Sequence, residues 1–75
     1  MAETNTALVE KYTKILTDAQ LENEDGTKWS TTQINDTVAD ILSGDEEAYK
    51  ILTSASNDLT AAMQGSADAL ELYKI

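Results

Sequence analysis

The feature that most constrains the fold is a regular stripe of small and apolar residues in the C-terminal part of this 75-residue chain. Its members stand alternately four and three positions apart, which is the spacing of a helix that packs along one side. Two signals compete for the start of this helix: Ser43 forms a capping box with Glu46, and Asp45 follows a Gly44 that ends the preceding helix. The pattern predicts a long helix over residues 45–74, with a stripe of Ala48, Leu52, Ala55, Leu59, Ala62, Ser66, Ala69 and Tyr73.

Gly65 interrupts this helix, because a glycine inside a helix costs about 1 kcal/mol relative to alanine. An unbroken helix of about thirty residues would reach about 45 Å, more than two shorter upstream helices can cover. We therefore expect a bend or break near Gly65. The apolar tail then has two solutions: it folds back as a fourth short helix, or a second chain covers it. In the second case Leu70, Leu72 and Tyr73 form an oligomer seam.

Two shorter helices are predicted upstream. The first covers residues 5–22, capped by Asn5 or Thr6, and leaves residues 1–4 as a frayed N-terminus. The second covers residues 31–43 and begins at a capping box of Ser30 and Gln33. The chain also lacks proline, which favours long helices. Together these signals predict one all-α domain, a small three-helix bundle with a long C-terminal helix.

Trp29, the only tryptophan, directly precedes the N-cap of the second helix. One interpretation is a hydrophobic staple, in which Trp29 packs against Ile34 at the edge of the core. The other is an anchor in a partner's pocket, since tryptophan is enriched among interface hot spots. The sequence leaves both open.

Acidic residues gather in two clusters, at a turn ahead of Trp29 and at the start of the third helix. A calcium loop with Gly26 at its sixth position fails, because Leu21 and Thr32 would occupy the first and last ligand positions. By helix length the clusters lie about 20 Å apart, at opposite ends of the second helix. With Trp29 they form the candidate partner-binding set: Glu22, Glu24, Asp25, Asp45, Glu46 and Glu47.

The composition excludes most catalytic chemistry. The chain has no cysteine and no histidine, which removes thiol chemistry, the usual zinc sites and an imidazole base. Its three glycines stand alone, so no phosphate-binding loop or nucleophile elbow is present. We expect no enzyme, no cofactor and no metal. No run of residues is apolar enough for a membrane span or arranged as a signal peptide, so we expect a cytoplasmic protein.

A net charge of −9, from 14 acidic residues against five lysines, restricts the partner. The short link at Gly44 resembles a helix-turn-helix, but its second helix would begin with three acids that phosphates repel. We therefore expect no direct contact with nucleic acid, because no basic patch can displace counterions. An anionic membrane is disfavoured for the same reason. The expected partner is another protein, and a basic one remains open.

Two functions follow from these observations. The first is a small acidic protein-binding module, an inhibitor or adaptor of phage or mobile-element type that acts on a larger, basic, nucleic-acid-handling protein. Imitation of nucleic acid is a sharper form of it, although the acids beyond Glu47 are sparse for a phosphate track. The alternative is a structural or assembly protein that forms a homodimer or larger oligomer through its C-terminal helix.

Overall fold

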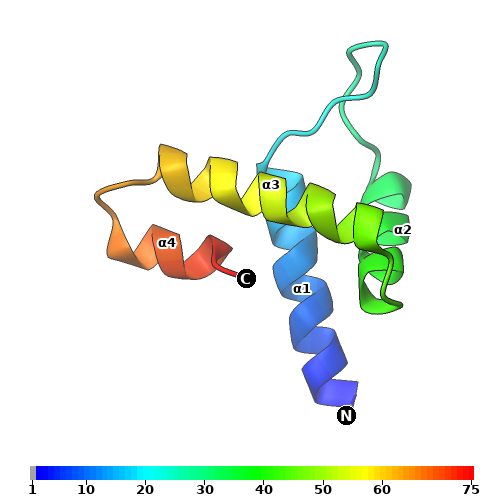
Figure 1. Ribbon diagram of the computed structural model, residues 1–75, viewed down its shortest axis with the longest axis horizontal. Coiled ribbons are helices and arrows are strands. Elements are labelled where there is room, and N and C mark those ends of the chain that lie inside the picture. The colour runs from blue at the N-terminus through cyan, green and yellow to red at the C-terminus, as the bar shows by residue number, and fades with distance from the viewer. Residues whose placement is uncertain (1) are drawn as a thin grey trace.

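Four helices make up the fold of the computed structural model, which describes residues 2–75 (Figure 1). They are α1 (Ala2–Asp18), α2 (Thr31–Leu42), α3 (Glu46–Ala62) and α4 (Ala67–Tyr73). Met1 lies outside the described residues, as do the side chains of residues 2–5 and of Ala69. The helix α3 crosses α1, while α4 turns back beside α3 and also contacts α1. The predicted all-α bundle with a break near Gly65 is confirmed, and the short fourth helix is present.

The core is small and draws on all four helices. Ile15, Leu16 and Leu52 are its most completely buried side chains, and they join α1 to α3. The predicted stripe supplies the α3 side of the core as far as Leu59, whereas Ala62 and Ser66 are exposed. The remaining core residues are Ile34, Val38 and Ile41 of α2, Ala48 and Ala55 of α3, and Tyr73 of α4.

The helix α1 begins and ends earlier than predicted. Its first described residue is Ala2, ahead of the expected cap at Asn5 or Thr6, and it stops at Asp18 instead of residue 22. The end is set by Gln20, which takes a left-handed conformation with φ of 56° and donates its N–H to the Thr17 carbonyl. The frayed state of residues 1–4 remains a prediction.

Local capping defines α2 and α3 as the sequence indicated. The capping box of Ser30 and Gln33 is formed at the start of α2. At its end Gly44 has φ of 99°, and the N–H of Asp45 donates to the Asp40 carbonyl at 3.0 Å, as in a Schellman motif. Asp45 then caps α3 by accepting the N–H of Ala48. Of the two competing caps, Asp45 is therefore the one used.

The tail after Gly65 folds back onto its own chain. Gly65 has φ of 99°, which reverses the chain between α3 and α4. Tyr73 is then only 6% exposed, and its hydroxyl donates to the Asp18 carboxylate at 2.7 Å. The buried Ser56 hydroxyl donates to the Tyr73 carbonyl. Lys14 forms an ion pair with the Asp18 carboxylate at 3.1 Å. These contacts hold α4 against both α1 and α3.

None of the helices formed by the described residues is both long and apolar enough to cross a membrane.

Replacing Tyr73 with phenylalanine removes the hydroxyl that donates to Asp18 and keeps the buried ring. We expect the free energy of unfolding to fall by about 1 kcal/mol, the usual contribution of a partly shielded hydrogen bond. Urea unfolding followed by circular dichroism measures this. Tyr49 is 48% exposed, so Tyr49→Phe is the matched control and should change stability by less than about 0.5 kcal/mol. Equal losses in both variants would contradict the role of the Tyr73 hydroxyl.

The same contact predicts a pH dependence. The hydrogen bond from Tyr73 and the ammonium of Lys14 lower the pKa of Asp18. A carboxyl group of this kind stabilises the fold above its unfolded pKa of about 3.9, and that contribution is lost as pH falls through the lower folded pKa. We expect the stability difference between the parent and Asp18→Asn to shrink as acid is added below about pH 4. Chemical unfolding at a series of pH values tests this, and a difference that does not vary with pH would refute it.

Candidate partner-binding groove

A groove opens between the loop of residues 19–30 and one side of α3. Its volume is about 390 Å³. Leu21 and Trp29 from the loop and Ile51 and Ala55 from α3 give it an apolar lining. Ile51 is 37% exposed, although isoleucine is usually buried. The groove therefore leaves apolar surface open to solvent, and we refer to it as the Trp29 groove.

Trp29 stands between this groove and the core. Its backbone N–H donates to the Leu21 carbonyl at 3.0 Å, which fixes the two residues side by side. On its other side a smaller hollow of about 120 Å³ is lined by Trp29, Leu16 and Ile34. No hydrogen bond among the described residues uses the indole N–H, and none of their buried side-chain nitrogens lacks a partner, so this N–H reaches the surface. Half-buried Trp29 thus supports the core edge and also presents a face to the groove.

Hydrogen bonds hold the loop in place beside α3. Glu22 and Lys28 form an isolated antiparallel bridge, and their side chains form an ion pair at 2.8 Å. The Asn23 carboxamide also exchanges two hydrogen bonds with the carboxamide of Gln33, at 2.7 and 3.3 Å. Gln33 also accepts the Ser30 N–H in the capping box. The loop is therefore tied to the start of α2, which gives the groove a defined wall.

Acidic side chains outnumber basic ones around the groove. Glu22, Glu47 and Asp58 line it together with a single lysine, Lys50, so three carboxylates and one ammonium leave a charge of −2. The hydrogen bond from Lys28 lowers the pKa of Glu22, which stays ionised. Glu47 lies 3.7 Å from Lys50. Asp58 takes part in no ion pair among the described residues, so its charge is open to a partner.

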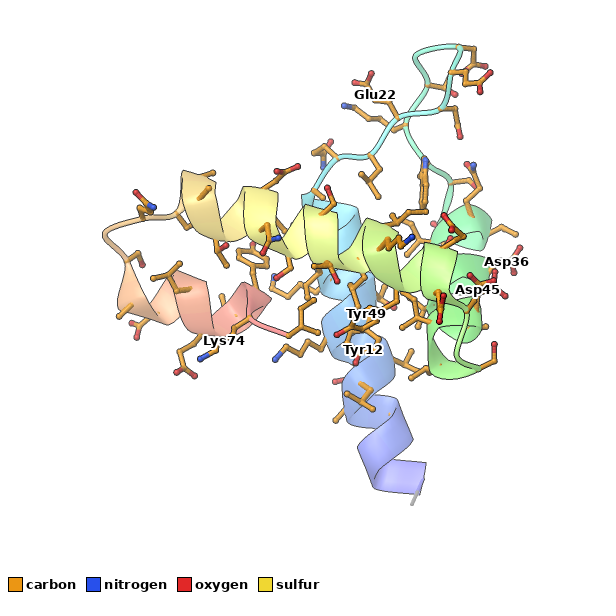
Figure 2. The ribbon with its side chains drawn as sticks, viewed as in Figure 1. Tyr12, Glu22, Asp36, Asp45, Tyr49 and Lys74 are labelled. Atoms are coloured by element: carbon orange, nitrogen blue, oxygen red, sulfur yellow. The ribbon has the colours of Figure 1, made fainter. Side chains whose placement is uncertain are left out.

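Three of the predicted partner-binding residues meet at this groove: Trp29, Glu22 and Glu47. The two acidic clusters flank opposite ends of α2, and one residue of each, Glu22 and Glu47, lines this groove. The two ends of the loop lie beside α3 and place Glu22 at the same groove as Glu47, whereas the tip of the loop extends away from the helices (Figure 1). Figure 2 shows Glu22 on this loop and Asp45 at the junction of α2 and α3.

The other predicted acids lie elsewhere. Glu24 and Asp25 are exposed in the turn, where Asp25 accepts the N–H and hydroxyl of Thr27, and these hydrogen bonds lower its pKa. Asp45 and Glu46 line a separate hollow of about 440 Å³ at the corner of α2 and α3, beside Tyr49. Asp25 and Asp45 thus have structural partners in the fold.

The predicted seam residues divide between surface and core. Leu72 is 52% exposed and Leu70 is half-buried, so both retain surface that a second chain could reach. Tyr73 does not, because its ring lies in the core of its own chain. In this fold Tyr73 holds the tail in place instead of forming a seam.

Six groove residues were absent from the predicted partner-binding set: Leu21, Lys50, Ile51, Ser54, Ala55 and Asp58. A signal exists for three of them, because Ile51, Ser54 and Asp58 continue from Glu47 as a second stripe at spacings of four, three and four beside the buried stripe of α3. Nothing in the sequence shows that the loop would stand against this stripe.

The lining of the groove determines the kind of ligand that it can contact. Among the described residues, no three carboxylates are grouped so that they could hold a metal ion. The groove combines an aromatic face, apolar side chains and net negative charge. Such a surface suits a ligand with an apolar body and a positive end.

Comparison with protein-family models, curated proteins and solved structures finds no match to this chain.

The acidic surroundings predict how ions reach Trp29, whose fluorescence is uncomplicated because it is the only tryptophan. We expect caesium to quench it more strongly than iodide, with each ion normalised to free N-acetyltryptophanamide, because the groove attracts cations. In Asp58→Asn the preference should fall, whereas the matched change Asp36→Asn on α2 should leave it unchanged. Iodide quenching equal to that of caesium would contradict the assigned field.

Proposed function

We propose that this chain is a small acidic protein-binding module, and that the Trp29 groove receives a basic segment of a larger protein. The observation that carries the proposal is the convergence of Trp29, Ile51 and the acidic side chains in one groove. Tryptophan is a frequent anchor at interfaces. The contacts that surround such an anchor contribute little binding energy themselves but exclude water from it. The groove thus has both parts of a recognition surface.

Charge selects the class of partner. With a net charge of −9 the chain repels phosphates, so nucleic acid and anionic membranes are poor ligands. A lysine or arginine side chain can instead approach Asp58 while its aliphatic part lies along Trp29 or Ile51. A basic protein with apolar residues between its cations fits the groove best.

The shape of the groove favours a helical segment. Its α3 wall runs from Glu47 to Asp58, which is about 16 Å along a helix axis. Ser54 and Ala55 lie within this wall, and their small side chains allow another backbone to approach closely. An amphipathic helix of about three turns would match this length, as in other helix-in-groove interfaces.

The biological role in this proposal is that of an inhibitor or adaptor. Occupying a basic surface of a nucleic-acid-handling protein would block or redirect that surface, and needs no catalysis or cofactor from this chain. The proposal places this activity in the cytoplasm and includes phage or mobile-element proteins as its setting.

A synthetic amphipathic helix tests the proposal. The probe is a tryptophan-free peptide of alanine, leucine and lysine, about 14 residues long, titrated while Trp29 fluorescence and amide NMR shifts are followed. We expect shift changes in residues of the groove, and affinity about tenfold lower in Asp58→Lys, since a close charge pair becomes repulsive.

The matched control is Asp36→Lys, which makes the same change of charge on the exposed side of α2, away from the groove (Figure 2). It should reduce affinity much less than Asp58→Lys does. A peptide with glutamate in place of lysine should not bind. Equal effects of the two substitutions would mean that net charge alone attracts the peptide, and the groove would be rejected as the site.

A further inference from the structure

A second cleft lies on a different part of the surface, between α1 and α4. Its volume is about 360 Å³, and its walls are Ala7, Glu10, Lys11 and Lys14 of α1 with Glu71 and Leu72 of α4. The α1 residues are spaced at three, one and three, so they share one face of that helix. Leu72 is the most exposed of the large apolar side chains described, at 52%. We refer to this surface as the α1–α4 face.

The charge of this face differs from that of the whole chain. Two carboxylates and two ammonium groups line it and sum to zero, on a protein whose net charge is −9. Lys14 is engaged with Asp18, but Glu10, Lys11 and Glu71 take part in no ion pair among the described residues. Lys74 lies at the end of α4 (Figure 2). Unpaired groups of both signs are therefore presented side by side around an exposed leucine.

We propose that the α1–α4 face binds a second copy of this chain, with a two-fold axis through the cleft. In this arrangement α1 of each copy lies against α4 of the other, so that Lys11 of one copy meets Glu71 of the second copy, and the reverse pair forms by symmetry. The two Leu72 side chains then lie near the axis. Tyr73 keeps its place in the core of its own chain.

The mixed charge is what selects a second copy as the occupant. A surface with both signs is complementary to itself under a two-fold axis, whereas a strongly basic partner would leave Lys11 facing like charge. Two chains of charge −9 repel each other over the rest of their surfaces. They can therefore approach most easily through a face of zero net charge. The Trp29 groove has a different lining and stays open, which would give a dimer two grooves.

Exchange of the two charges tests the pairing directly. Lys11→Glu alone should weaken the dimer about tenfold, because two like-charged contacts replace two favourable ones. Glu71→Lys alone should do the same. A mixture of the two variants should associate as a heterodimer, because every cross pair is again of opposite sign. Sedimentation equilibrium over a range of concentrations, with one variant carrying a fluorescent label, measures all three samples.

The control is Lys50→Glu, which alters the net charge as Lys11→Glu does but lies at the Trp29 groove; it should leave dimerisation nearly unchanged. Circular dichroism verifies that each variant is folded. If a charge variant is unfolded, Leu72→Asp is used in its place, with Leu42→Asp as its control. A parent protein that stays monomeric at about millimolar concentration would overturn the proposal. A mixture that associates no better than the single variants would overturn the Lys11–Glu71 pairing and the axis with it.

Discussion

The hydrogen bond from Tyr73 to Asp18 joins parts of the chain that are 55 positions apart, and the arrangement of the tail depends on it. The α4 helix has only seven residues, too few to be stable alone, so its helical structure relies on the surface that it covers. Tyr73 supplies the ring that completes the core, while Ser56 and Asp18 satisfy its carbonyl and hydroxyl. A chain with few large core residues gains from each such contact, because a domain of this size buries little apolar surface.

Closing the tail in this way leaves two surfaces of different character. The Trp29 groove is apolar with a charge of −2, whereas the α1–α4 face is neutral and carries both signs. Three of the five lysines, Lys11, Lys14 and Lys74, lie on α1 or just after α4. The other two lysines pair with acids of the Trp29 groove, Lys28 with Glu22 and Lys50 with Glu47, so Asp58 is the groove carboxylate that takes part in no ion pair among the described residues. The proposed roles of the two surfaces follow from the unpaired Asp58 at the groove and from the mixed charge of the α1–α4 face.

The parts of the fold that sequence predicts are those set by local chemistry. Ser30 with Gln33, Gly44 and Gly65 each mark a helix boundary through contacts within a few residues, and the structure confirms these boundaries. The early end of α1 was missed because Gln20 takes a left-handed conformation that favours glycine or asparagine. The placement of Glu22 and Glu47 at one groove and the burial of Tyr73 depend on contacts between distant segments. Periodicity identifies the face of a helix but does not specify which segment will cover it.

Whether α4 packs on its own chain can be measured most directly by isotope-filtered NMR on a mixture of labelled and unlabelled protein. The ring of Tyr73 lies with its centroid 5.9 Å from the Lys14 ammonium nitrogen. Nuclear Overhauser effects between Tyr73 and side chains of α1 should therefore appear within one labelled chain and be absent between labelled and unlabelled chains. Effects between Tyr73 of one kind of chain and α1 of the other would show that α4 is exchanged with a second copy, and would contradict the closed tail on which this account rests.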